Sequence, residues 1–124
     1  MKYAIITECI MKRIEDLDVY KYSYELIIRI YEVTKSFPSD EKFGLTSQMR
    51  RSAVSICSNM SEGGARISKG EQKQFLGIAL GSVAELRLHI SLSKNIGFID
   101  EEVADDLIDK IDIIHKMLTG LINK

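Results

Sequence analysis

Apolar residues recur at helical spacing in four segments of this chain, and residues that end helices separate the segments. The first segment, residues 17–36, ends before Phe37 and Pro38, and Asp16 or Asp18 is expected to cap its start. Long helices joined by short loops pack as antiparallel neighbours. The pattern therefore predicts an all-α protein, an up-down-up-down four-helix bundle.

The other three helices have recognisable ends. Thr46 is expected to cap the second helix, which a pair of glycines at 63–64 should end, because glycine is unfavourable inside a helix. Ser68 and Glu71 form a Ser-x-x-Glu capping box at the start of the third helix. Asp100 is expected to cap the fourth, which continues close to the end of the sequence.

The first helix has two apolar faces, so it should contact two neighbours. One face consists of Leu17, Tyr20, Tyr24, Ile27, Ile28 and Tyr31, and the other of Val19, Leu26, Ile30, Val33 and Phe37. Tyrosines at exposed positions can stack on nucleic-acid bases. Because these tyrosines share a stripe with aliphatic residues, we interpret them as core residues whose hydroxyls reach the boundary.

The third helix is also apolar on two sides. One side carries Phe75, Leu76, Ala79, Val83, Leu86 and Ile90, and the other carries Gly77, Leu80, Gly81, Ala84, Leu88 and Leu92. The second side is rich in small residues, which let helices approach closely, and the partners within one bundle rarely cover both sides of a helix. We therefore expect a homo-oligomer whose interface includes Gly77, Leu80, Gly81, Ala84 and Leu88.

One domain is expected, comprising residues 16–124, with residues 1–15 as a partly dispensable N-terminal extension. Met1 and Met11 are both acceptable starts. Cys9 and Cys57 are far apart and lie in no metal-binding spacing, so both are expected to be reduced. With no unbroken apolar run of membrane-spanning length, the sequence predicts a cytoplasmic protein without membrane contact.

Catalytic chemistry is not evident in the sequence. There is no nucleophile paired with a base and no phosphate-binding glycine loop, since the glycines fit neither established spacing. Asp112 and His115 have the spacing of a metal-binding pair, but Asp112 points away from the apolar stripe of its helix. We therefore expect no enzyme activity, metal, cofactor or small-molecule substrate.

Charge is unevenly distributed although the net charge is only -1. Residues 41–94 contain eight basic and four acidic side chains, whereas residues 100–124 contain seven acidic and three basic ones. The basic candidates for contacting phosphates are Arg50, Arg51, Arg66, Lys69 and Lys73. The alternative is that this basic flank faces the acidic helix of the same or a neighbouring subunit, or faces water.

Two polar residues before the glycine pair have no motif to explain them. Asn59 lies beside the buried stripe of the second helix, where we expect it to hydrogen-bond a neighbouring helix, and Glu62 lies on the outer face. We interpret both as structural.

Three stretches carry a resemblance to a known family: IEDLDVYKYSYEL, FGLTSQMRRSAVSICSNMSEG and IALGSVAELRLHI. Residues 13–123 resemble the four-helix-bundle proteins encoded in intervening sequences of bacterial 23S rRNA genes, often labelled as a ribosomal protein. They are also similar to the accessory variability determinant of diversity-generating retroelements, which binds a reverse transcriptase and nucleic acid. The resemblance implies a homopentameric bundle without known catalytic residues. The family's core motif falls on Arg50, Arg51, Ser55, Ser58, Asn59, Glu62 and Gly63, although the strongly basic balance of the retroelement relatives is missing.

Two functional hypotheses follow. The first is a non-enzymatic, oligomeric module that binds RNA or a ribonucleoprotein through the basic residues of the second and third helices. The second is a structural or protein-interaction scaffold that does not touch nucleic acid.

Overall fold

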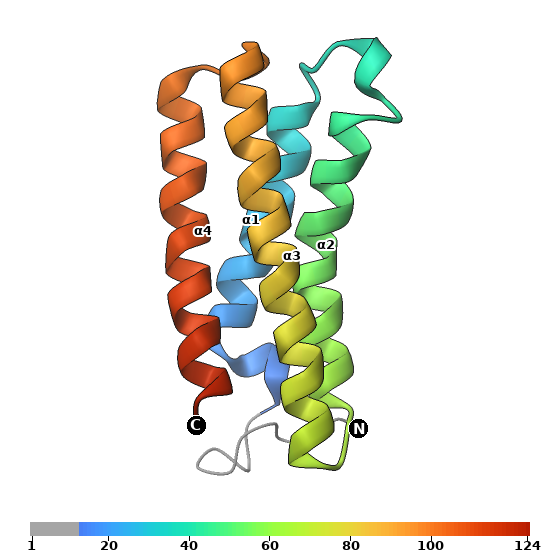
Figure 1. Cartoon of the computed structure of the whole chain (residues 1–124), viewed down its shortest axis with the longest axis vertical. Coiled ribbons are helices and arrows are strands. Elements are labelled where there is room, and N and C mark those ends of the chain that lie inside the picture. Colours follow the sequence, from blue (N-terminus) through green and yellow to red (C-terminus); the bar gives the residue numbers. More distant parts are fainter. Residues whose placement is uncertain (1–12) are drawn as a thin grey trace.

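The structure is a computed structural model that describes residues 13–124, and all regular structure in that range is helical. Its elements are η2 (Ile14–Asp16), α1 (Asp18–Thr34), η3 (Ser39–Glu41), α2 (Leu45–Gly64), α3 (Lys69–Ile96) and α4 (Glu101–Ile122). The four long helices lie side by side, each antiparallel to the one before it (Figure 1). The predicted four-helix bundle is confirmed.

The core runs along the bundle axis, with each helix contributing one inner face. The contact between α2 and α3 is the most extensive, and that between α1 and α4 the least. At Gly63 the two helices approach closely, because an added Cβ atom would lie 3.2 Å from the Gln72 carbonyl oxygen and 3.3 Å from Phe75 Cβ. Glycine at position 63 is thus a packing requirement as well as a signal near the end of α2.

The starts of α3 and α4 follow the prediction. The Ser68 hydroxyl accepts a hydrogen bond from the Glu71 N–H at 3.1 Å, and Asp100 Oδ1 accepts from the Val103 N–H at 2.8 Å. Gly97, with a φ of 94°, ends α3 in the left-handed conformation that glycine adopts most easily.

The starts of α1 and α2 differ from the prediction. Leu17, and neither Asp16 nor Asp18, occupies the cap position of α1, because the short helix η2 already includes Asp16 and α1 begins at Asp18. Thr46 does not cap α2 either. It is buried within the helix, and the Leu45 N–H donates instead to Glu41 Oε1 at 2.9 Å.

One of the two apolar faces of α1 is buried in the bundle, whereas the other is only partly covered. Val19, Leu26 and Ile30 are buried, whereas Tyr24 and Ile28 are more than half exposed. Tyr31, 40% exposed, also lies outside, so the assignment to the core is wrong for Tyr24 and Tyr31, whereas Tyr20 is partly buried against the core. The reason is geometric: each helix of a four-helix bundle has one inner face, and within residues 13–124 the residues farthest from it remain exposed.

Part of the expected N-terminal extension is described. Ile14 is fully buried in the core, immediately before α1. Residues 1–12, with both candidate start positions and Cys9, lie outside the described residues.

Candidate functional site

The outer side of α3 is an exposed apolar face. Gly77, Gly81, Ala84 and Leu88 are all exposed on it, and Leu88 retains 56% of its accessible surface. Among residues 13–124, no atom lies within 4 Å of a Cβ added at Gly77 or Gly81, so packing within this part of the subunit does not require glycine at either position. Leu80 departs from the predicted set, because it is partly buried against the core. We call the four exposed residues the α3 outer face.

α3 is long and apolar, yet many of its residues are exposed to solvent. It is the one helix within residues 13–124 long and apolar enough to span a membrane by those measures, with a mean hydropathy of 1.4 over 18 residues. One such helix is weak evidence for a membrane, because core helices of bundles pass the same test. Only 28% of that window is buried in this bundle, so most of it is partly or fully exposed.

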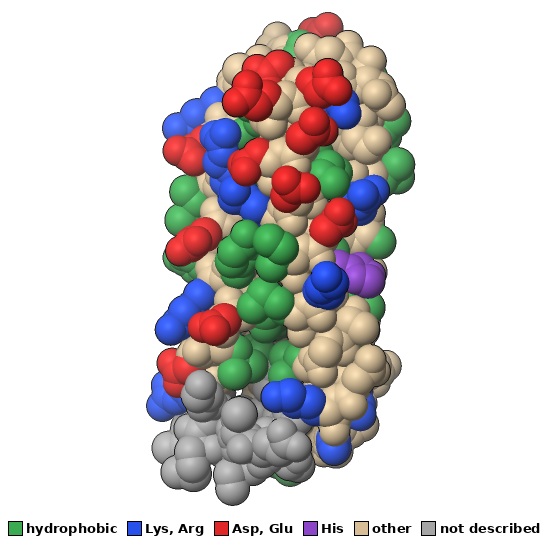
Figure 2. Space-filling view, turned by 90° about the vertical axis from the view of Figure 1, so that its left-hand side faces the viewer, with side chains coloured by type: hydrophobic (Ala, Val, Ile, Leu, Met, Phe, Trp, Pro, Cys, Tyr) green, Lys and Arg blue, Asp and Glu red, His purple; other side chains and the backbone are tan. Residues whose placement is uncertain are grey.

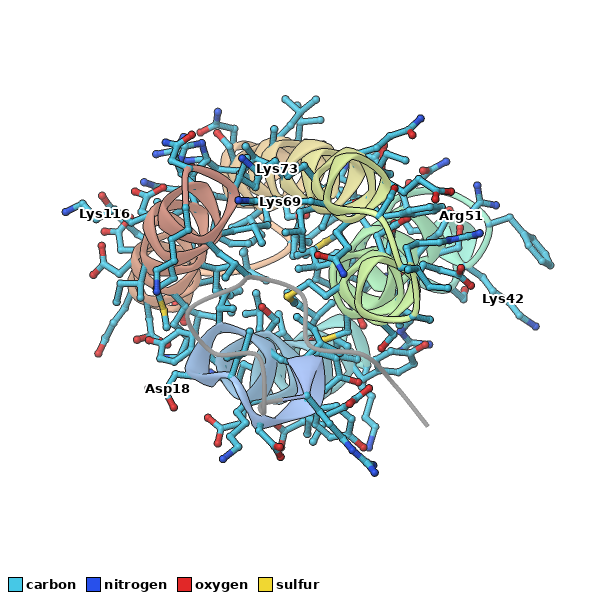
Figure 3. The ribbon with its side chains drawn as sticks, turned by 90° about the horizontal axis from the view of Figure 1, so that it is seen from below. Asp18, Lys42, Arg51, Lys69, Lys73 and Lys116 are labelled. Carbon is cyan, nitrogen blue, oxygen red and sulfur yellow. The ribbon has the colours of Figure 1, made fainter. Side chains whose placement is uncertain are left out.

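The five predicted basic residues do not form one surface. Arg50 and Arg51 lie near the start of α2, whereas Arg66, Lys69 and Lys73 lie at the opposite end of the bundle. Fifteen positions separate Arg51 from Arg66, which corresponds to roughly 20 Å along a helix axis. In the view along the bundle axis, Arg51 points outward on the side of α2, whereas Lys69 and Lys73 lie on the side nearer α4 (Figure 3).

Two of these five cations are engaged within the subunit. Arg50 Nε donates to Thr34 Oγ1 at 2.9 Å, and its guanidinium lies 4.6 Å from the centre of the Tyr31 ring. Arg66 lies 4.7 Å from the centre of the Phe75 ring, and its Nη2 is 3.2 Å from Glu62 Oε2. The other three cations, Arg51, Lys69 and Lys73, form no ion pair with another described residue.

Basic residues on the flank of α3 face the acidic helix α4. Arg87 Nε lies 3.0 Å from Asp112 Oδ1, and Lys94 Nζ lies 3.2 Å from Asp105 Oδ1. The hydrogen bond with Asp112, and then its negative charge, raise the pKa of Arg87. Acidic side chains also gather over the upper end of the molecule on the α4 side (Figure 2). Arg87 and Lys94 therefore pair with the acidic helix of their own subunit, as the alternative to phosphate binding predicted.

Asn59 joins a short chain of polar contacts between α2 and α3. Its Nδ2 donates to the Ser55 carbonyl oxygen and to Ser55 Oγ, both at 2.9 Å. Ser55 Oγ is 2.7 Å from Ser82 Oγ on α3. Asn59 thus bonds within its own helix and reaches the neighbouring helix only through Ser55, which corrects the predicted direct bond. Glu62 is accounted for by its ion pair with Arg66.

Reactive groups are few in the part of the chain described. Burial raises the pKa of the Cys57 thiol to about 12, so at neutral pH it is a poor nucleophile. No group of three or more metal-binding side chains occurs among residues 13–124. Asp112 is directed to Arg87, as described above, and His115 is exposed.

One surface at the α1–α2 connection was missed by the sequence reasoning. Phe43 is 87% exposed, and Lys42 Nζ lies 5.5 Å from the centre of its ring. Beside them is an open hollow of about 490 Å³. It is lined by Tyr31, Lys42, Phe43, Thr46, Ser47, Arg50, Arg51 and Val54. The available signal was an aromatic residue inside a polar loop, directly after a lysine and before Gly44.

Comparisons with known proteins find a similar solved structure and a matching family. It resembles the crystal structure of a protein with unknown function from the S23 ribosomal protein family of Bacteroides thetaiotaomicron VPI-5482, with a TM-score of 0.77 and 25% sequence identity. The similarity covers 86% of this chain and 99% of that one. No curated protein matches the sequence. The model of the 23S rRNA-intervening sequence protein family matches residues 15–120, and the chain belongs to that family.

Proposed function

We propose that this protein is a non-enzymatic, self-associating helical bundle that presents its unpaired cations to RNA or a ribonucleoprotein. The observation that carries the proposal is the α3 outer face. Leu88 and Leu92 remain 56% and 41% exposed, and the glycines between them and the start of α3 leave room for a second helix. Contiguous exposed apolar surface of this kind marks an interface.

A cyclic assembly suits this surface. A ring is built from two different surfaces of each subunit, so the α3 outer face needs an apolar counterpart on the next copy. The outward side chains of Tyr24 and Ile28 on α1 supply apolar surface of that kind. Five subunits per ring is the number that the family resemblance favours.

Assembly also bears on nucleic-acid binding. Three unpaired cations in a chain of net charge -1 are a weak electrostatic site on their own. Repeating Arg51, Lys69 and Lys73 around a ring multiplies the phosphate contacts, and linked sites bind more tightly than separate ones. The second candidate, a protein scaffold, is favoured by the ion pairs of Arg66, Arg87 and Lys94 within the subunit.

Self-association is tested by light scattering on the wild type and on Leu88→Glu. A charge on the α3 outer face should convert the oligomer into folded monomers, with helical circular dichroism unchanged. Lys116→Glu is the control, because Lys116 is exposed on α4 and points away from the bundle (Figure 3). A wild-type protein that is monomeric at every concentration would contradict this part of the proposal.

RNA binding is tested by fluorescence anisotropy with a structured RNA across a salt series. Binding should weaken as salt rises, because released counterions drive the association. Arg51→Glu combined with Lys69→Glu should abolish it while the bundle stays folded. No binding at low salt would leave the scaffold as the supported function.

A further inference from the structure

The hollow at the α1–α2 connection is rich in positive charge. Its lining includes Lys42, Arg50 and Arg51, and none of its eight lining residues is acidic. The nearby Glu41 is turned to the start of α2, where its Oε1 accepts the Leu45 N–H at 2.9 Å. Lys42 and Arg51 point outward on the same side of the bundle (Figure 3). The hollow is therefore complementary to an anion.

One edge of the hollow is an exposed aromatic ring. Burying a phenylalanine side chain is worth about 1.5 to 3 kcal/mol, and Phe43 forgoes this by staying 87% exposed in a short connection. Lys42 Nζ lies 5.5 Å from the centre of its ring. The ring is available to a planar ligand.

The opposite wall is held in place. Arg50 is fixed between Thr34, which accepts its Nε hydrogen at 2.9 Å, and the Tyr31 ring, 4.6 Å from its guanidinium. A guanidinium restrained in this way loses little conformational freedom when an anion arrives. The hollow thus combines one preorganised cation, two outward cations and a free aromatic ring.

We propose that this hollow binds an unpaired segment of RNA, with Phe43 stacked on a base and Lys42 and Arg51 on the neighbouring phosphates. The inference rests on the proposed RNA-binding function and names its site and the form of the ligand. Unpaired nucleotides can turn their bases onto aromatic side chains, whereas a duplex keeps its base faces stacked inside. An acidic peptide would satisfy the cations, but it would need an aromatic residue at the right position to give the exposed ring a comparable partner, whereas every nucleotide carries a base.

The opposite end of the bundle provides a matched comparison. There, Ile67 is 79% exposed in the α2–α3 connection, close in sequence to the unpaired Lys69 and Lys73. Both ends thus present a large apolar side chain beside cations. Of these two connections, only the one that contains Phe43 carries an exposed aromatic ring, so base stacking distinguishes them.

The experiment measures anisotropy of a labelled ten-nucleotide oligouridine and of an RNA hairpin with a fully paired stem. Phe43→Ala should weaken oligouridine binding by about 5-fold to 150-fold, the range that corresponds to the loss of one stacked base. Phe43→Trp should preserve binding, and Ile67→Ala should leave it unchanged. Arg51→Glu should weaken binding and flatten its salt dependence, whereas Lys116→Glu should do neither.

The outcomes separate this inference from the proposed function. If the wild type binds neither RNA, both fail. If it binds RNA, and Phe43→Ala has no effect while Lys69→Glu weakens binding, the RNA function stands and the hollow is overturned as its site. Preference for the hairpin over oligouridine overturns the unpaired ligand. Binding of an acidic, tyrosine-containing peptide that oligouridine cannot displace overturns RNA in favour of a protein partner.

Discussion

The two sides of α3 are both apolar, yet they have opposite roles in the single chain. Its inner side is fully covered, with exposures of 0 to 1% at Leu76, Ala79, Val83, Leu86 and Ile90. The outer side carries two glycines without close neighbours and leucines that remain exposed. The inner side holds the subunit together, while the outer side has surface to offer a partner. Apolar character alone therefore does not distinguish the buried side of this helix from its exposed side.

Substituting a leucine on each side gives the largest expected contrast. Leu86→Ala should lower the free energy of unfolding by about 2 to 5 kcal/mol, because it leaves a cavity in the core. Leu88→Ala should change the stability of the separated subunit by less than about 0.5 kcal/mol, since the side chain is already exposed. Urea denaturation at low protein concentration measures both. Equal losses would remove the distinction between the two sides.

Glycine substitutions should have opposite signs at the two kinds of position. Gly63→Ala should destabilise the subunit by about 1 to 2 kcal/mol, since the added methyl presses on the Gln72 backbone and overpacking outweighs the gain in helix propensity. Gly81→Ala should stabilise the separated subunit by up to about 1 kcal/mol, because its Cβ enters open space. Thermal unfolding gives both signs, and a loss of stability in Gly81→Ala would show that this position packs within the subunit.

The start of α3 should contribute less than its inner side. Ser68→Ala removes the acceptor for the Glu71 N–H and should cost about 1 kcal/mol. Ser91→Ala is the control, because Ser91 is exposed in the middle of the same helix and alanine is favoured there. Urea denaturation of both variants checks the difference, and equal effects would mean that the cap is not stabilising.

The flank of α3 that faces α4 should contribute least. Arg87 and Asp112 are both about half exposed, so their 3.0 Å ion pair should stabilise the subunit by less than about 1 kcal/mol. A double-mutant cycle with Arg87→Ala and Asp112→Ala measures the coupling, which high salt should reduce. A coupling as large as the loss in Leu86→Ala would place the flank on a par with the core.

The fold could be predicted from the sequence because helical periodicity and end signals agree. Ser68, Asp100 and Gly97 mark helix ends that local chemistry alone determines. The prediction that Thr46 caps α2 was wrong, because α2 begins one residue earlier, at Leu45. The Glu41 carboxylate, from the preceding turn, accepts the hydrogen bond of the Leu45 N–H. The position of Tyr31 could not be predicted, because periodicity identifies two apolar faces on α1 but does not say which one the bundle covers.

The candidate sites were harder to predict from the sequence than the fold was. Arg51 and Lys69 are close in the sequence, but most of α2 separates them along the bundle. The hollow combines residues of α1, α2 and their connection, so its composition emerges only when Tyr31 and Arg50 are placed side by side. The small residues of α3 are exposed, as the sequence indicated, and self-association through them stays a prediction.

The buried Cys57 gives the bundle an internal reporter of its own opening. The thiol faces α1, 3.9 Å from the Tyr20 carbonyl oxygen, and its pKa is raised to about 12 from an ordinary value of 9.0. An unfolded chain releases this proton at lower pH than the folded one, so the thiol favours the folded state below pH 9 and loses that contribution as the pH rises toward 12. Alkylating reagents react with the thiolate, which forms more easily once the thiol is exposed to water. They therefore label Cys57 mainly in molecules in which α1 and α2 have separated. The rate of labelling at Cys57, followed by peptide mapping, thus times the separation of these two helices in an otherwise native protein.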